Sequence, residues 1–172
     1  MIWNVSGVSV RNRATTPLLK IELIAVGTKP PSWVLDGIEQ YASRLKRECK
    51  FLISEIKTAR RRKQSVDSLK EDEGKAILAA VSSSARVIAM DREGKNWSTE
   101  QFAGKLQVWS QQTNHFQFLI GGPDGLAGAC LSKACEAWSL SKLTFPHFMV
   151  RVLLSEQIYR ALMVNAGHPY HK

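Results

Sequence analysis

The 172-residue sequence lacks the marks of several common protein classes. It has three cysteines, and no two of them form a C-x-x-C pair, which argues against a disulfide framework or a zinc ribbon. We therefore expect Cys49, Cys130 and Cys135 to be reduced residues that contribute to packing. No uninterrupted apolar run is long enough to cross a bilayer, so no membrane segment is predicted. Internal repeats and low-complexity tracts are also absent.

Acidic residues are absent from the start of the chain, which reads MIWNVSGVSVRNRATTPLLK, and the first acid is Glu22. This composition resembles an organelle transit peptide, and an unimportant leader or a misassigned start codon is the alternative. We therefore divide the chain into a leader, residues 1–20, and one domain, residues 21–172. A working transit peptide predicts a chloroplast or mitochondrial location, and its absence predicts a cytoplasmic one.

Basic residues outnumber acidic ones, 24 to 15, which gives a formal net charge of +9. An anionic partner is therefore expected, and nucleic acid is the commonest one. The chain is long enough for one domain with a substantial core. The residues suited to phosphate contacts are Lys29, Arg60, Arg61, Arg62, Lys63, Lys142, Arg151 and Lys172. For residues 60–63 a solvated loop is an equally weighted alternative.

Strands and helices alternate along the domain. Apolar runs predict strands at residues 21–26, 51–56, 86–91 and 116–120, and a short extended piece at 139–145. The helical period predicts helices at residues 33–48, 66–81, 99–112, 127–138 and 147–166. Ser32 is expected to cap the first helix, and Ser98 with Gln101 to form a capping box for the third. This order predicts an α/β fold, a mainly parallel sheet with helices on both faces.

A glycine-rich stretch, LIGGPDGL, follows the buried strand FQFLI. It matches neither the dinucleotide-binding fingerprint nor the P-loop, and an ordinary type I turn is the simplest interpretation. In open α/β sheets, however, ligands bind outside the carboxyl ends of the strands. Three segments are expected to converge there: Met90–Asp91, Gly121–Gly122, and the segment SLSKLTFPH at residues 139–147.

Four motifs in order, LIGGPDGL, WSLSKLTFPH, MVRVLLSEQIYRA and a terminal HPYHK, closely resemble one family. The chain is similar to the SPOUT-superfamily methyltransferases that act on N3 of pseudouridine in large-subunit (23S-type) ribosomal RNA. The resemblance begins at IAVGTK, runs from about Ile21 to Lys172, and leaves out the leader. It implies S-adenosylmethionine as cofactor, a C-terminal trefoil knot that holds it in a bent shape, and a homodimer with the active site at the subunit boundary.

The resemblance also implies which residues contact the cofactor. They are Met90, Gly121, Leu140, Ser141, Lys142, Leu143, Thr144 and Phe145. Backbone N–H and C=O groups there are suited to reading the adenine edge, and the glycine lets the backbone approach. For the apolar members Leu140, Leu143 and Phe145, plain core packing is the alternative.

Catalytic roles are expected on the last helix and the tail. A cation is needed to stabilise the charge left when N3 loses its proton, and Arg160 is the first candidate. Its alternative role is a surface ion pair with Glu156, four residues earlier. The resemblance implies that the tail reaches the partner's site, where Tyr170 stacks on a base and His171 assists proton removal.

No metal is expected, because the H-x-x-H spacing of the tail has no third ligand. His147, after Pro146, is a candidate cap for the last helix. The predicted activity is methylation of N3 of a pseudouridine in large-subunit ribosomal RNA, with RNA or the ribosome as partner. Two alternatives stay open: a non-catalytic, knotted RNA- or ribosome-binding protein, and the same chemistry on another RNA such as tRNA.

Overall fold

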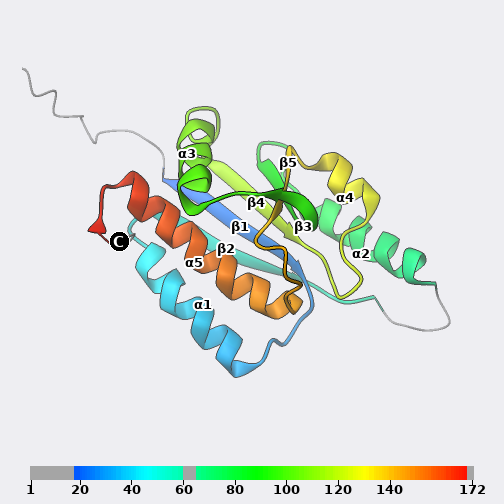
Figure 1. Ribbon diagram of the computed structural model, residues 1–172. Coiled ribbons are helices and arrows are strands. Elements are labelled where there is room, and N and C mark those ends of the chain that lie inside the picture. The colour runs from blue at the N-terminus through cyan, green and yellow to red at the C-terminus, as the bar shows by residue number, and fades with distance from the viewer. Residues whose placement is uncertain (1–17, 60–64, 170–172) are drawn as a thin grey trace, which may run out of the picture.

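A five-stranded parallel sheet forms the centre of the protein (Figure 1). The computed structural model describes residues 18–59 and 65–169, and the strand order is β2-β1-β4-β3-β5. The strands are β1 (Leu19–Val26), β2 (Cys49–Ile56), β3 (Arg86–Asn96), β4 (His115–Ile120) and β5 (Glu136–Ser139). The helices are α1 (Ser32–Leu45), α2 (Val66–Ala80), α3 (Thr99–Trp109), α4 (Gly128–Lys133) and α5 (His147–Asn165). The predicted α/β class is confirmed.

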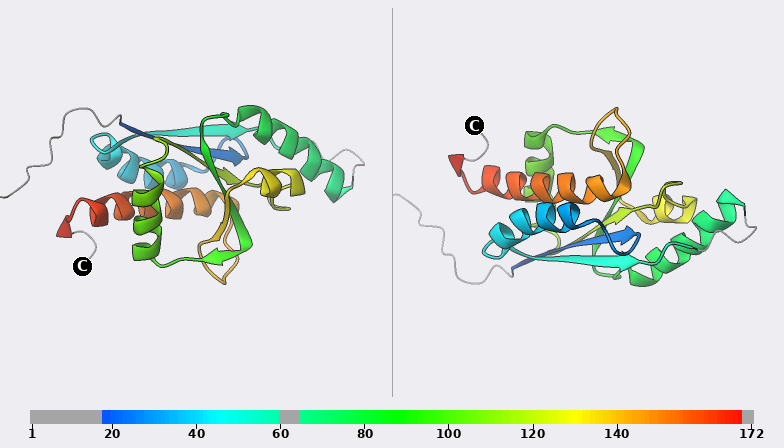
Figure 2. Two further views of the ribbon diagram at one scale, coloured as in Figure 1. Left: turned by 90° about the horizontal axis from the view of Figure 1, so that it is seen from above. Right: turned by 90° about the horizontal axis from the view of Figure 1, so that it is seen from below.

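Helices cover both faces of the sheet, as two further views show (Figure 2). Side chains alternate along a strand, so Ile21 and Leu23 of β1 join the core under α1, α3 and α5, whereas Ile24 joins the core under α2 and α4. All six residues of β4 are buried, because this strand lies in the middle of the sheet between two helical layers.

The predicted leader falls almost entirely on residues 1–17, which lie outside the described residues. β1 begins at Leu19, shortly before the predicted domain start at Ile21. The interpretation of residues 1–20 as a targeting segment therefore stays a prediction.

Strand β3 is longer than expected, and the prediction of a loop after Asp91 is wrong. The strand bulges between Met90 and Lys95, so that both residues pair with Trp138 of β5. Gly94 lies at the bulge, and a Cβ atom there would sit 2.7 Å from the carbonyl oxygen of Ala137. Only glycine permits this close backbone approach, which keeps the second half of β3 in the sheet.

The prediction of one helix over residues 127–138 is also wrong, because α4 ends at Lys133 and β5 follows. The backbone N–H of Cys135 donates to the carbonyl of Val87 at 2.8 Å and starts this last strand. Pairing with β3 therefore overrides the local helical pattern. Cys49 and Cys130 are free and buried as expected, whereas the free Cys135 is exposed and does not serve packing.

The two predicted helix caps have different outcomes. The capping box of α3 is confirmed: Ser98 Oγ accepts from the N–H of Gln101 at 3.2 Å, and Gln101 Oε1 accepts from the N–H of Ser98 at 2.8 Å. The cap at Ser32 is wrong, because Ser32 is already the first helical residue and Pro31 occupies the cap position. Proline has a φ suited to a helix start but no side-chain acceptor.

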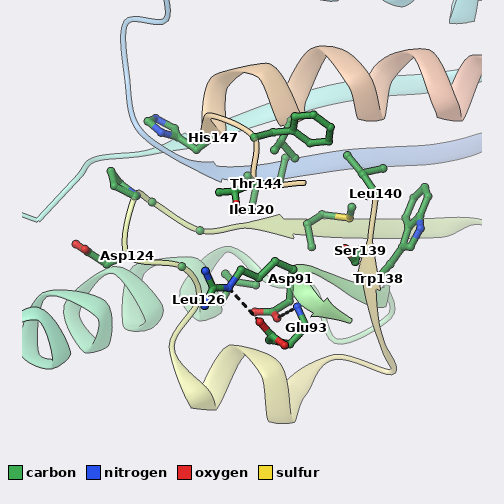
Figure 3. Close-up of a pocket in the computed structure, with 18 of the residues that line it drawn as sticks. Asp91, Glu93, Ile120, Asp124, Leu126, Trp138, Ser139, Leu140, Thr144 and His147 are labelled. Carbon is green, nitrogen blue, oxygen red and sulfur yellow. Dashed lines mark hydrogen bonds and ion pairs between the residues drawn. The ribbon is translucent and has the colours of Figure 1, made fainter. Parts of the chain in front are cut away.

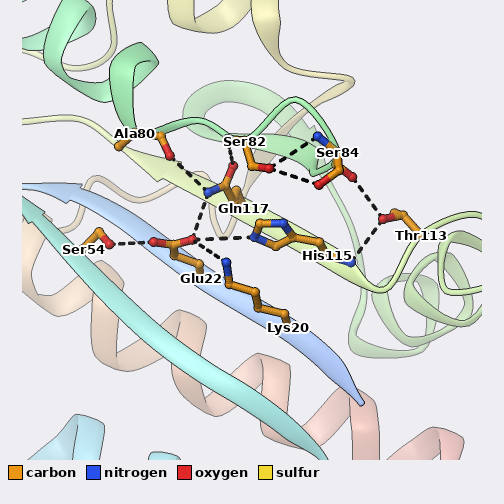
Figure 4. A network of polar contacts seen from close by, with 9 residues as sticks. All are labelled: Lys20, Glu22, Ser54, Ala80, Ser82, Ser84, Thr113, His115 and Gln117. Atoms are coloured by element: carbon orange, nitrogen blue, oxygen red, sulfur yellow. Dashed lines mark hydrogen bonds and ion pairs between the residues drawn. The ribbon is translucent and has the colours of Figure 1, made fainter. Parts of the chain in front are cut away.

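A polar network crosses the sheet on the face that α2 covers (Figure 4). The Glu22 carboxylate accepts hydrogen bonds from Ser54 Oγ at 2.6 Å and from Gln117 Nε2 at 2.9 Å. Burial by itself would raise the pKa of Glu22, but these hydrogen bonds and the Lys20 ammonium lower it below its usual value of 4.5. Burial, reinforced by Lys20, lowers the pKa of His115 below 6.5, so its imidazole is neutral at pH 7.

This network makes the fold sensitive to acid. A lowered pKa in the folded state means that the unfolded chain binds protons first, so stability is lost as pH falls, below about 6.5 for His115 and below about 4.5 for Glu22. We expect Glu22→Gln to lower the free energy of unfolding by about 1–2 kcal/mol at pH 7 and to have a progressively smaller effect as the pH falls below about 4.5. Urea unfolding across this range measures the difference, and a pH-independent effect would contradict the assignment.

Candidate active site

A cavity of about 550 Å³ opens at the carboxyl ends of β4 and β5, beside the middle of β3 (Figure 3). Its volume lies within the range of about 300–1,000 Å³ that is typical of small-molecule sites. Residues from all three predicted segments line it: Met90 and Asp91 at the end of the first half of β3, Gly121 and Gly122 after β4, and much of residues 139–147. The predicted convergence of these segments is therefore confirmed.

Most of the predicted cofactor residues line this cavity. They are Met90, Gly121, Leu140, Ser141, Leu143, Thr144 and Phe145. Lys142 is exposed and does not line it. Core packing is wrong for Leu143, because its side chain is 70% exposed. The segment is shaped locally, since Ser141 Oγ accepts from the N–H of Leu143 at 3.0 Å and the Ser141 carbonyl accepts from Ser139 Oγ at 2.7 Å.

The glycine turn, defined here as residues 121–125, forms one wall of the cavity. The N–H of Gly125 donates to the carbonyl of Gly122 at 3.0 Å, and Gly125 has a φ of +85°, which favours glycine. A Cβ atom on Gly121 would lie 2.5 Å from the carbonyl carbon of Gly125. Glycine is thus required at position 121 because the backbone of Gly125 and Leu126 passes so close to it. The same backbone occupies the space where a side chain of residue 121 would lie, so this space is not open to a ligand.

The cavity has a charged part and an apolar part. Asp91 and Glu93 lie on one side of it and Ile120 and Leu140 on another (Figure 3). The charged residues of the lining are Lys70, Asp91, Arg92, Glu93 and Asp124. Asp91 Oδ1 accepts from the N–H of Glu93 at 2.8 Å, and the Arg92 guanidinium pairs with Glu93 at 3.1 Å. Such a cavity suits a ligand with a flat apolar portion and a charged portion of mixed sign.

His147 lines the cavity, although sequence reasoning assigned it only a capping role. The capping role is wrong, because His147 is the first residue of α5 and Pro146 precedes it as the cap without a side-chain hydrogen bond. Burial, together with the positive charge of Arg151, lowers the pKa of His147, so the imidazole is neutral at pH 7. The centroid of its ring lies 4.1 Å from the centroid of the Phe148 ring. No pattern in the sequence distinguishes this histidine from a helix cap.

Arg151 is fully buried, so its expected contact with phosphate is wrong. One guanidinium nitrogen, Nη2, donates to the carbonyls of Val26 and Gly27 at 2.9 and 2.7 Å, and the other, Nη1, to Glu55 Oε1 at 3.0 Å. These acceptors lie at the carboxyl ends of β1 and β2. Arg151 therefore fixes the first turn of α5, which carries His147 and Val150 into the cavity.

Arg160, the one predicted catalytic residue among the described residues, does not line this cavity. Arg160 lies ten residues after the last cavity-lining position of α5, Val150, or about 15 Å farther along the helix. Its guanidinium pairs with Glu156 at 2.6 Å, so the predicted ion pair is present. Tyr170, His171 and the phosphate candidate Lys172 lie outside the described residues, as do Arg60, Arg61, Arg62 and Lys63.

Within residues 18–59 and 65–169, no group of three or more His, Cys, Asp or Glu side chains is arranged to hold a metal ion. In the same residues no helix is both long and apolar enough to cross a membrane.

Comparisons with known proteins identify the family and agree with this fold. A family described as predicted SPOUT methyltransferases matches residues 19–171. The ribosomal RNA large subunit methyltransferase H of Methylococcus capsulatus is 44% identical over 155 residues, which are 90% of this chain and 100% of that protein. The protein of the same name from Nitrosococcus oceani is 47% identical over 155 residues, which are 90% of this chain and 99% of that protein. A probable methylase family protein from Haemophilus influenzae shares the fold, with 14% identity and a TM-score of 0.50 over 90% of this chain and 70% of that one.

The buried contacts of Arg151 predict a large effect on stability. Arg151→Lys keeps the positive charge but loses the planar set of donors, so buried carbonyls at Val26 and Gly27 lose partners. We expect the free energy of unfolding to fall by about 1–3 kcal/mol. The matched control is Arg92→Lys, where the ion pair with Glu93 is exposed and the change should stay below about 0.5 kcal/mol. Equal effects in urea unfolding would contradict the role of Arg151.

Proposed function

The chain belongs to the SPOUT methyltransferase family, and from this membership we propose that it transfers a methyl group from S-adenosylmethionine to N3 of a pseudouridine in large-subunit ribosomal RNA. The observation that carries the proposal is identity of 44–47% over almost the whole length of two ribosomal RNA large subunit methyltransferases. The choice of N3 of pseudouridine rests on the motifs LIGGPDGL, WSLSKLTFPH and HPYHK.

The residues of the cavity fit S-adenosylmethionine. Leu140, Ile120 and Phe145 offer an apolar slot for the adenine ring, and the neighbouring backbone offers hydrogen bonds to its edge. The charged part, with Asp91 and Lys70, suits the amino and carboxylate groups of the methionine portion. When bound, the cofactor supplies an electrophilic methyl group. We further propose that residues 140–145 belong to the trefoil knot of the family.

Arg160, the residue proposed to stabilise charge on the base, lies in the second half of α5. This helix has 19 residues and is about 28 Å long, and Figure 1 shows it crossing the molecule to the end marked C. Arg160 lies about 15 Å farther along the helix than Val150, the last residue of α5 that lines the cavity.

This distance favours a homodimer in which each active site combines two chains. We place Arg160, Tyr170 and His171 of one subunit at the cavity of the other. There the Arg160 guanidinium would stabilise the negative charge on the pyrimidine ring once N3 has lost its proton. Tyr170 would stack on the base and His171 would accept the proton.

The proposed function is tested in two steps. Calorimetric titration of the purified protein with S-adenosylmethionine should show binding, and folded protein without binding would contradict the enzyme assignment. Nucleoside analysis of large-subunit RNA from cells that lack the protein should then show the loss of N3-methylpseudouridine. Loss of a methylated nucleoside from tRNA instead would redirect the activity to that RNA.

Arg160 provides a test of the shared site. Arg160→Ala should lower turnover much more than affinity for S-adenosylmethionine, because Arg160 lies far from the cavity of its own chain. Thr144→Arg, which fills the cavity from an exposed lining position, should abolish cofactor binding.

Mixed dimers of these two inactive variants make the prediction specific. If Arg160 acts in the partner's cavity, one site of each mixed dimer combines an intact cavity with an intact Arg160, and activity returns. If Arg160 acts within its own chain, every site in the mixture is defective. A methyl-transfer assay on re-equilibrated mixtures separates the two, and the absence of recovered activity in verified mixed dimers would contradict the shared site.

A further inference from the structure

A buried carboxyl group, Glu73 of α2, lies directly behind the glycine turn and has no role in the chemistry proposed above. Its side chain does not line the cavity, and the residue is only 7% exposed. Glu73 Oε1 accepts a hydrogen bond from the backbone N–H of Ala59 at 3.1 Å. Burial of a carboxyl group costs free energy, so we ask what Glu73 contributes beside the segments that contain Ala59 and Gly122.

The second carboxyl oxygen packs against the glycine turn itself. A Cβ atom on Gly122 would lie 2.8 Å from Glu73 Oε2 and 3.1 Å from Cγ1 of Val26. The carboxyl group thus occupies the space beside the Gly122 Cα atom. Because the carbonyl of Gly122 accepts the hydrogen bond that closes the turn, a shift of Gly122 would move the whole cavity wall.

The next residue of α2 holds the segment that leaves the turn. A Cβ atom on Gly74 would lie 2.6 Å from the Cβ of Ala127, and Cys130 Sγ lies 3.6 Å from the Gly74 carbonyl oxygen. Consecutive residues of one helix therefore contact the glycine turn and the start of α4. The shape of the turn depends on α2 as well as on its own glycines.

We propose that Glu73 is a positioning residue, which holds the glycine turn in the shape that binds the methyl donor by packing against Gly122 while it anchors Ala59. The inference rests on the proposed function, because it takes the cavity as the donor site. Glu73 acts through Gly122 and does not touch the ligand. Its removal would leave space into which the turn can move, so the donor would lose contacts along this wall.

The first test compares three variants of α2 by calorimetric titration with S-adenosylmethionine and by thermal unfolding. Glu73→Ala should weaken binding of the donor about tenfold, since small displacements of a binding wall are costly. Glu73→Gln keeps the volume and the acceptor for Ala59, so it should restore most of the affinity. Ile77→Ala is the matched control, because Ile77 is buried one turn farther along α2. This substitution should reduce stability without weakening donor binding.

The second test uses the contact with Gly122 directly. Gly122→Ala should weaken donor binding about tenfold, because its Cβ collides with the Glu73 carboxyl group. In the Glu73→Ala background the same change should cost at least about threefold less, since the new methyl group enters the vacated space. This coupling is a property of the contact, and a general loss of stability would not produce it.

The outcomes separate this inference from the proposed function. A wild-type protein that does not bind S-adenosylmethionine contradicts the function itself. Wild-type binding with unchanged affinity in Glu73→Ala, or an equal loss in Ile77→Ala, overturns the positioning role alone. If Glu73→Ala does not fold, Glu73→Asp replaces it in both comparisons, and additive effects of Glu73→Asp and Gly122→Ala overturn the role.

Discussion

The guanidinium of Arg151 donates hydrogen bonds to Val26, Gly27 and Glu55, and in this way it binds α5 to the carboxyl ends of β1 and β2. Hydrogen bonds from a charged donor are stronger than neutral ones, and burial removes the competition of water. The first turn of α5 carries His147 and Val150 into the cavity. The wall of the cavity formed by His147 and Val150 is thus held in position because the buried Arg151 joins α5 to β1 and β2, which are far from it in the sequence.

The helices on the opposite face of the sheet support another wall of the cavity, the glycine turn, in a similar way. α5 and Arg151 belong to the helices on one face of the sheet, whereas α2 and Glu73 belong to the other face. Each helix places one buried charged group near the carboxyl edge, where the strands end and the loops need anchoring. Loops without such anchors are the mobile parts of a fold. The cavity is therefore shaped by both helical layers, although its lining comes largely from strand ends and loops.

These two charged residues also show what the sequence could and could not predict. The strands β1 and β4 were predictable, because their apolar runs follow directly from burial between two helical layers, and the edge strand β2 was predictable from an apolar run that is only partly buried. The second half of β3 was not, because its pairing depends on the close approach of Gly94 to Ala137, and β5 was not, because pairing with β3 overrides its local helical pattern. Arginine is usually exposed, so the buried role of Arg151 has no signal in the sequence. The family resemblance supplied seven of its eight cofactor residues correctly as cavity residues, and it also included Lys142, whose side chain is exposed.

The length of α5 has a consequence for how the proposed activity is assembled. The cavity lies at the first turn of this helix, and Arg160 lies in its second half, about 15 Å farther along than the cavity-lining Val150. A two-fold axis perpendicular to α5 would exchange these ends, so each cavity would receive Arg160 and the tail of the other chain. One symmetric contact would then complete two sites at once. A single chain would hold the donor without the groups that prepare the base, so dimer formation would be a condition for methyl transfer.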